Sequence, residues 1–164
     1  MVASLIVKKN FKLRRFTPTD LEKVIDINKR CLPENYSNTF FLNLYESFPE
    51  TFIVAEKSEE IVGYIMCRIE RRISDFRLVG IVRKGHVISI AVLPEYRRQS
   101  IGYLLMLEAI KAMKIYNAEE CVLEVRRSNI SAVNLYRKMG FKAIRTLYGY
   151  YANGEDAYRM ACKL

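Results

Sequence analysis

The chain has 164 residues, of which 51% are hydrophobic and 27% charged, values typical of a globular protein with one domain and a buried core. The apolar runs are too short for a membrane span or a secretory signal, and four scattered cysteines with one histidine lack the spacing of a metal site. We therefore expect a cytoplasmic protein with no metal and no membrane partner, and its net charge of +9 favours an anionic partner.

Hydrophobic periodicity predicts a mixed α/β order of elements, β-α-α-β-β-β-α-β-α-β-β, in one domain over residues 1–164, with an N-terminal extension at 1–10. Thr17 and Pro18 are typical of a helix start, Pro33 ends that helix, and Gly140 ends the last one. In chain order the predicted elements are a strand at 11–16, a helix to about residue 30, a helix from near 37 to 48, strands at 51–56, 61–68 and 86–93, a helix from 101 to 116, a strand at 120–126, a helix at 130–139, and strands at 141–150 and 156–162.

The excess positive charge is concentrated between Cys67 and Val87, where six basic residues accompany two acidic ones. Such a run is most often a solvated face. A polyphosphate cofactor, an acidic protein substrate, and nucleic acid or the ribosome surface would each fit the charge. Because no helix-turn-helix, zinc finger or RNA-binding aromatic motif appears, we expect no specific nucleic acid.

The segment from His86 to Met106 combines a buried strand, a proline stop, a short basic loop and a helix start. Free backbone N–H groups and the helix dipole favour an anion at a helix N-terminus, and small residues let phosphate oxygens approach the main chain. Residues 97–102 are therefore a candidate phosphate site. An ordinary strand-loop-helix connection with solvated arginines is the alternative.

This segment resembles motif A of the GNAT superfamily of N-acetyltransferases: Arg97 and Gly102 match the ends of the pattern, and Ser100 replaces a usual glycine. The replacement matters only if the backbone there needs a positive φ. The resemblance covers nearly the whole chain and implies the GNAT fold, with a mixed, twisted, seven-stranded sheet and about four helices. It also implies acetyl-CoA as co-substrate. The residues that it assigns to acetyl-CoA in this segment are Ile90, Ala91, Val92, Arg97, Arg98, Gln99, Ser100, Ile101, Gly102 and Tyr103.

Two further stretches resemble the N-terminal acetyltransferases related to the NatA catalytic subunit, its archaeal relatives and the ribosomal-protein-alanine acetyltransferases. One is the loop from Leu32 to Tyr36, and the other is the hairpin from Gly149 to Tyr158. In that family the loop borders the site for the first substrate residues, the loop glutamate is proposed to act in catalysis or substrate placement, and the hairpin walls the peptide groove. A helix-ending turn and a surface hairpin are the alternatives. The residues implied for substrate binding are Leu32, Pro33, Glu34, Asn35, Tyr36, Tyr150 and Tyr151.

The segment from Glu124 to Phe141 is similar to motif B of the family, which implies that Asn129 contacts the pantetheine arm and that Tyr136 bonds or protonates the leaving thiolate. A core aromatic is the alternative for Tyr136. His86 and Glu124 match positions at which archaeal relatives carry a His and a Glu that are proposed to deprotonate the amine. A solvated strand end for His86, and a pairing of Glu124 with Arg126, stay open. The candidate catalytic residues are therefore Glu34, His86, Glu124 and Tyr136.

The resemblance implies an N-terminal protein acetyltransferase that passes acetyl from acetyl-CoA directly to α-amines by general-base catalysis. Ser, Ala, Thr and Met-Leu starts are the substrates that the family implies. We expect a monomer that acts on protein or nascent-chain N-termini, and the charge leaves association with ribosomes open. The alternatives are a GNAT enzyme for lysine side chains or a small amine, and a non-catalytic module that binds CoA or RNA.

Overall fold

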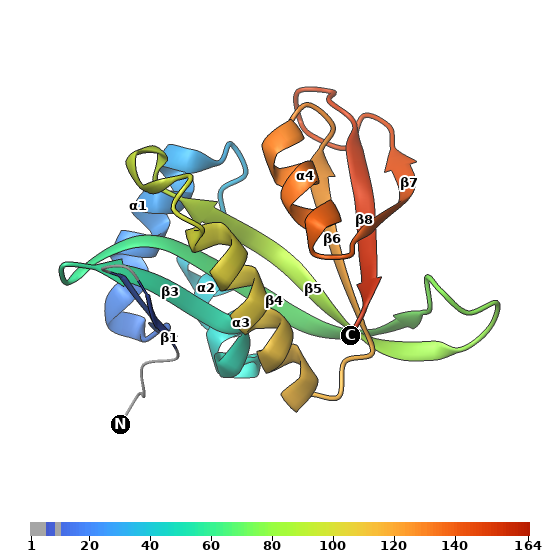
Figure 1. Ribbon diagram of the computed structural model, residues 1–164, viewed down its shortest axis with the longest axis horizontal. Coiled ribbons are helices and arrows are strands. Elements are labelled where there is room, and N and C mark those ends of the chain that lie inside the picture. Colours follow the sequence, from blue (N-terminus) through green and yellow to red (C-terminus); the bar gives the residue numbers. More distant parts are fainter. Residues whose placement is uncertain (1–5, 9–10) are drawn as a thin grey trace. The chain divides into compact units, whose positions relative to one another are not determined.

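The computed structural model describes residues 6–8 and 11–164, so most of the N-terminal extension predicted at 1–10 lies outside the described residues. The chain forms two compact units (Figure 1). Unit 1 comprises the described residues up to Arg68 together with Ile88–Ile115, and unit 2 comprises Ile69–Val87 and Tyr116–Leu164. The two long strands β4 (Glu60–Ile73) and β5 (Ile81–Val92) contribute to both units.

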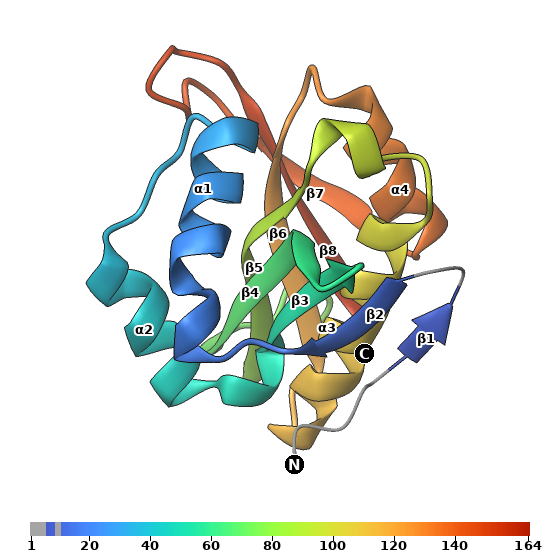
Figure 2. The same ribbon diagram turned by 90° about the vertical axis from the view of Figure 1, so that its left-hand side faces the viewer.

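Unit 1 is a sheet with helices on both faces. Its strands have the order β1-β2-β3-β4-β5, and the pairs β1–β2, β2–β3 and β3–β4 are antiparallel. Figure 2 shows α1 and α2 on one face of this sheet and α3 on the other. The elements that lie wholly in unit 1 are β1 (Ile6–Lys8), β2 (Phe11–Arg15), α1 (Leu21–Cys31), α2 (Asn38–Ser47), β3 (Phe52–Lys57) and α3 (Ile101–Ile115).

Aromatic side chains fill the space between the sheet and helices α1 and α2. Phe16, Phe41, Phe52 and Tyr64 are almost completely buried there, and the rings of Phe16 and Phe52 stack with centroids 4.0 Å apart. Burial of such large apolar surfaces is the main favourable contribution to folding. It fixes α1 and α2 against β3 and β4.

Side chains cap two helix starts of unit 1, at the predicted Thr17 and at Ser37. Thr17 precedes a 3-10 turn, η1 (Pro18–Asp20), and the Asp20 carboxylate accepts a hydrogen bond from the Thr17 N–H at 2.8 Å. Ser37 caps α2, because its Oγ accepts from the Phe40 N–H at 3.2 Å. Prolines also open two further 3-10 turns, η2 (Pro49–Thr51) and η3 (Pro94–Tyr96).

Unit 2 contains the segments of β4 and β5 from Ile69–Val87 and has the strand order β4-β5-β6-β8-β7. Strands β5 and β6 are parallel, and their register places His86 opposite Val122. Strands β6 and β8 are antiparallel and place Glu124 opposite Arg159. Strands β7 and β8 are also antiparallel. The other elements of unit 2 are β6 (Glu120–Arg126), α4 (Ile130–Lys138), β7 (Lys142–Leu147) and β8 (Ala157–Lys163).

The seven predicted strands and four predicted helices are all present, and β1 is an additional short strand. Three predicted boundaries were wrong. Strand β4 continues to Ile73 and β5 begins at Ile81. The strands extend past the point where the side chains, arginines among them, become exposed and the apolar pattern stops. Strand β7 ends at Leu147 and not at Tyr150, since Gly149 has φ +58° and turns the chain. Among the described residues, no helix combines the length and apolarity needed to cross a bilayer.

Candidate active site

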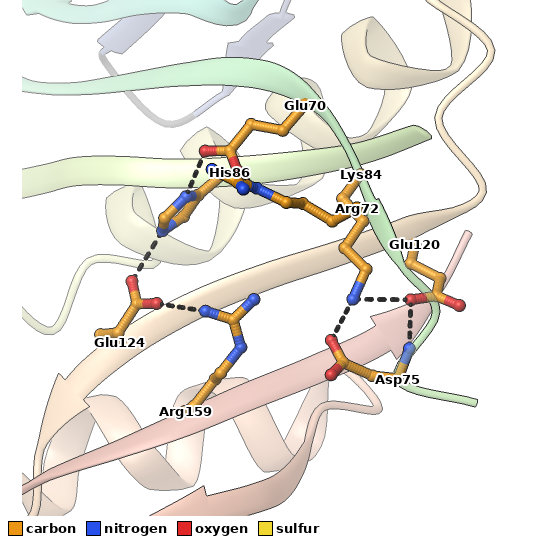
Figure 3. Close-up of polar contacts among 8 residues, drawn as sticks. All are labelled: Glu70, Arg72, Asp75, Lys84, His86, Glu120, Glu124 and Arg159. Carbon is orange, nitrogen blue, oxygen red and sulfur yellow. Dashed lines mark hydrogen bonds and ion pairs between the residues drawn. The ribbon is translucent and has the colours of Figure 1, made fainter. Parts of the chain in front are cut away.

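His86 lies between two carboxylates on the face that β4, β5, β6 and β8 share in unit 2 (Figure 3). Its Nδ1 is 2.8 Å from Oε1 of Glu70, and its Nε2 is 2.7 Å from Oε2 of Glu124. Glu124 accepts a further hydrogen bond from Arg159 Nη1 at 2.8 Å, and Glu70 accepts one from Arg72 Nε at 3.0 Å. The structure thus brings together the predicted pair of His86 and Glu124.

The Glu124 carboxylate is held in its ionised form. Burial alone would raise its pKa, but the hydrogen bond and charge of His86 and the charge of Arg159 outweigh burial, and the pKa lies below its usual range. The alternative pairing of Glu124 with Arg126 was wrong. Arg126 Nη1 donates instead to Glu155 Oε2 at 2.7 Å. The solvated strand end considered for His86 was also wrong, since only 13% of its side chain is exposed.

A second ionic cluster lies next to the first in unit 2 (Figure 3). The ammonium group of Lys84 contacts Asp75 and lies 3.3 Å from Glu120 Oε2, and only 1% of the Lys84 side chain is exposed. Glu120 also accepts hydrogen bonds from the Ser74 hydroxyl and from the Asp75 N–H. This cluster ties the connection between β4 and β5 to the start of β6.

The predicted phosphate loop lies at the N-terminus of α3 in unit 1. Residues 97–100 are exposed, and Arg98 and Ser100 have positive φ, +62° and +66°, whereas Gln99 does not. Alternation of left-handed with other backbone conformations turns successive N–H groups toward one side, which makes an anion-binding concavity. The Ser100 carbonyl accepts from Leu104 N at 3.0 Å and so begins the helix. These residues fit a pyrophosphate group, and Ser100 does occupy a positive-φ position.

The strand end that precedes this loop is anchored by side chains. Arg97 Nε donates to the Val92 carbonyl at 2.9 Å, and Cys31 Sγ lies 3.7 Å from the same oxygen. Ala91 is buried, and Ile90 and Val92 are half-buried, as expected from the alternation of a strand. Arg97 therefore holds the connection between β5 and α3 in place, a second role beside the predicted contact with phosphate.

The loop from Leu32 to Tyr36 is attached to β4 and β5 within unit 1. Asn28 Nδ2 donates to the Glu34 carbonyl at 3.2 Å and to Tyr64 Oη at 3.0 Å, and Tyr64 Oη in turn lies 2.7 Å from Ser89 Oγ. Tyr36 Oη donates to the Ile88 carbonyl at 3.4 Å. Burial raises the pKa of Tyr64, which therefore stays a neutral hydroxyl. Sequence reasoning missed Asn28, Tyr64 and Ser89, and no local motif marks them.

The predicted motif B residues have structural contacts in unit 2. Asn129 Oδ1 accepts from the Ala132 N–H at 3.1 Å and caps α4. Tyr136 is 6% exposed, and its ring centroid lies 5.9 Å from that of Phe141. Tyr136 thus packs as a core aromatic, an arrangement that leaves the proposed role of its hydroxyl open to test.

The hairpin from Gly149 to Tyr158 is held by an arginine that sequence reasoning did not assign to it. The Arg126 guanidinium lies over the Tyr151 ring, 3.7 Å from its centroid, and pairs with Glu155. Glu155 also accepts a hydrogen bond from the Ser128 hydroxyl. This bond, and to a smaller extent the hydrogen bond from Arg126, holds the pKa of the Glu155 carboxyl below its usual range. Tyr150 is half exposed, and its ring meets the Tyr151 ring edge to face, with centroids 5.1 Å apart.

The predicted site residues are distributed over both units. Unit 1 holds the Leu32–Tyr36 loop, the end of β5 and the phosphate loop, whereas unit 2 holds His86, Glu124, Tyr136 and the tyrosines of the hairpin. Within the described part of the chain, no group of three or more His, Cys, Asp or Glu side chains could hold a metal ion.

Comparison with known proteins gives a consistent assignment. Residues 21–141 match the Acetyltransferase (GNAT) family. The chain belongs to this family. An N-alpha-acetyltransferase of Sulfurisphaera tokodaii is 51% identical over 158 residues, which cover 95% of each protein. The N-terminal acetyltransferase A complex catalytic subunit NAA10 of Arabidopsis thaliana is 39% identical over 90% of this chain and 75% of its own length.

A solved structure agrees with the fold. Ard1 from Thermoplasma volcanium is 28% identical, with a TM-score of 0.81 over 95% of this chain and 99% of that one. The predicted GNAT fold, the predicted resemblance to NatA-type enzymes and the predicted acetyltransferase activity are thereby confirmed.

Proposed function

We propose that this chain transfers acetyl from acetyl-CoA directly to the α-amino group of protein N-termini. The observation that carries the proposal is the pairing of His86 with Glu124 at 2.7 Å in a chain that belongs to the GNAT family. Relatives with up to 51% identity that are named N-alpha-acetyltransferases support the α-amine as the acceptor. Ser, Ala, Thr and Met-Leu starts are the proposed first residues.

The chemistry requires a neutral amine, and this favours an N-terminus over lysine. An α-amino group has a pKa of about 8, so roughly a tenth of it is free base at pH 7, whereas a lysine amine with a pKa near 10.4 is less than about one part in a thousand free base. The His86–Glu124 pair, acting on the amine or through water, is the proposed proton acceptor. Glu34 is the second candidate, proposed to act on the substrate N-terminus.

The phosphate loop is the proposed holder of the acetyl-CoA pyrophosphate, through the backbone N–H groups of residues 98–103. Backbone N–H groups at Ile90–Val92 are proposed to polarise the thioester carbonyl, and acetyl-CoA supplies the activated acetyl group. Asn129 is the proposed contact for pantetheine, and the Tyr136 hydroxyl is the proposed donor to the leaving thiolate. The Leu32–Tyr36 loop, Tyr150 and Tyr151 are the proposed contacts for the substrate peptide.

We also propose that residues 1–164 form a single acetyltransferase domain and that the protein is a monomer in the cytoplasm. A further part of the proposal is association with ribosomes through the hairpin tip, which we define as residues 71–83. Its four arginines, Arg71, Arg72, Arg77 and Arg83, are exposed, and so are four aliphatic side chains. An exposed patch of this kind is a candidate interaction surface, and its charge favours an anionic partner. The exposed aliphatic residues are Ile73, Leu78, Val79 and Ile81.

Mass spectrometry of a peptide panel incubated with acetyl-CoA and the purified protein tests this function. The panel pairs peptides with free Ser, Ala, Met-Leu and Glu starts with N-blocked peptides that carry one lysine. We expect acetylation of free N-termini only, in an order that ranks the first residues. Acetylation of the blocked lysine peptides alone would move the enzyme to the lysine class. Acetyl-CoA binding without transfer to any peptide would support a binding module.

A further inference from the structure

Glu70 contacts His86 but has no role in the function proposed above. It lies on β4, close enough to His86 Nδ1 for a hydrogen bond at 2.8 Å, on the side of the ring away from Glu124. Only 14% of its side chain is exposed, and its second oxygen accepts from Arg72. Figure 3 shows the ring between the two carboxylates.

Both ring nitrogens of His86 face carboxylate oxygens at 2.7–2.8 Å. Each of these contacts needs one hydrogen between nitrogen and oxygen, but a neutral imidazole carries a single N–H and an ionised carboxylate carries none. A neutral ring can therefore donate to only one of the two carboxylates, and the nitrogen that faces the other keeps its lone pair. With the hydrogen on Nδ1, the Nε2 lone pair is the one that can accept a proton.

We infer that Glu70 is a positioning residue for acetyl transfer, which accepts the Nδ1 proton of His86 and so directs Nε2 toward Glu124. This inference rests on the proposed function. In the active form the ring is neutral, keeps its hydrogen on Nδ1 toward Glu70, and presents the Nε2 lone pair beside the Glu124 carboxylate. A carboxylate plays the same orienting part toward the catalytic histidine of Ser-His-Asp enzymes.

The proton and the electrons balance in this arrangement. The substrate ammonium loses its proton to the pair formed by Nε2 of His86 and Oε2 of Glu124, directly or through water. The amine nitrogen then forms the C–N bond, and the C–S bond breaks with the electron pair on the thiolate. The nitrogen loses its second proton, to the thiolate or to solvent, which leaves a neutral amide. The pair returns its proton to solvent before the next cycle. Glu70 keeps its own hydrogen bond throughout and takes no part in bond making.

The charge of Glu70 also favours the hydrogen on Nδ1, because an adjacent anion attracts it. The other charges near the ring are engaged: Arg72 with Glu70, Arg159 with Glu124, and Lys84 with Asp75 and Glu120. Arg72 lies on β4, Arg159 on β8 and Lys84 on β5, and Glu120 and Glu124 both lie on β6. Glu70 is thus a charge that can be removed without changing a residue of the proposed His86–Glu124 base.

His86 is the single histidine of the chain, so its ring can be followed alone. Long-range ¹H–¹⁵N spectra of ¹⁵N-labelled full-length protein give the protonation of each ring nitrogen as a function of pH. In Glu70→Gln, which lacks the negative charge, we expect the ring to lose its proton at lower pH than in wild type. Glu60→Gln, an exposed glutamate at the start of the same strand, is the matched control and is expected to titrate like wild type.

Kinetics with one N-terminal peptide provide the second measurement. We expect Glu70→Gln to lower kcat about tenfold, to leave KM for acetyl-CoA unchanged, and to move the acidic limb of the kcat–pH profile to lower pH. That limb belongs to the coupled group and not to one residue. Glu70→Asp keeps the charge and is expected to return the limb toward the wild-type position. A purely structural role would lower kcat equally at every pH.

The outcomes separate this inference from the proposed function. Ring titrations of wild type and Glu70→Gln that coincide, in a protein that acetylates N-termini, overturn the role of Glu70 alone. A loss of kcat that is the same at every pH also overturns it. A wild-type protein that acetylates no N-terminal peptide contradicts the proposed function, whatever the ring titration shows.

Discussion

Ser100 shows that a sequence motif does not by itself give the backbone angle at each of its positions. Its φ of +66° is in the left-handed region, where a side chain costs about 1–2 kcal/mol relative to glycine. The usual residue of the GNAT motif at this place is glycine, and here the backbone keeps the conformation with a serine. The phosphate loop therefore keeps its shape at a cost in local strain, and we expect that strain to be removable.

Ser100→Gly is predicted to stabilise the protein by about 1 kcal/mol, because relief of the left-handed strain exceeds the added freedom of glycine in the unfolded chain. Acetyl-CoA affinity is expected to be equal or higher, since the backbone N–H stays in place. Chemical denaturation and calorimetric titration measure the two effects. Gln99→Gly is the control, because Gln99 has no positive φ, and it is expected to lose stability. Equal losses in both variants would contradict the account.

The residues around His86 show which part of a site is readable from sequence. His86 and Glu124 could be selected because they match a family pattern on two predicted strands. Glu70 and Arg159 could not, since their contacts depend on which strands become neighbours and in what register. Arg126 was the nearest same-face cation to Glu124 in the sequence, but β8 places Arg159 directly opposite Glu124. Local spacing therefore proposed the wrong ion pair.

The elements of the fold were largely predictable, and their ends were not. Apolar periodicity located the strands and helices because a buried face imposes it. The same reasoning ended β4 too early and began β5 too late, since the hairpin that they form leaves its arginines and aliphatic residues exposed. The buried Lys84 explains how this hairpin is held, because it contacts Asp75 of the connection and Glu120 of β6.

Lys84→Ala is predicted to destabilise the protein by about 3–5 kcal/mol, because it leaves the Glu120 carboxylate buried without its cation. The midpoint of denaturant unfolding, at constant slope, measures the loss. Lys138→Ala removes an exposed lysine of α4 and is expected to change stability little. A Lys84→Ala protein as stable as the control would show that the cluster contributes nothing to the fold.

The same cluster predicts how stability depends on pH. Burial would raise the pKa of Glu120, but hydrogen bonds from Asp75 and Ser74 and the contact with Lys84 hold it below its ordinary value of 4.5. A carboxyl with a depressed pKa in the folded state stabilises above its unfolded pKa, and this contribution is lost as the pH falls through the folded pKa. We expect the free energy of unfolding to fall below about pH 4.5, and to fall less steeply in Lys84→Ala. Parallel curves would contradict this assignment.

At the scale of the whole molecule, the net charge of +9 predicts an anionic partner, and the hairpin tip is the proposed contact with ribosomes. Arg71→Glu with Arg77→Glu is predicted to reduce co-sedimentation with ribosomes strongly, and wild-type binding is expected to weaken as salt is raised. Lys114→Glu with Lys142→Glu makes the same change in net charge on other exposed elements. An equal loss in both double variants would show that only net charge matters.

The central claim is that the enzyme chooses the α-amine. One peptide that carries both a free N-terminal serine and an internal lysine, incubated with acetyl-CoA and the protein at pH 7, tests it directly. Fragmentation in the mass spectrometer assigns each acetyl group to one of the two amines. We predict a single acetyl group on the N-terminal nitrogen and none on the lysine. Acetylation of the lysine with a free N-terminus left behind would contradict the account.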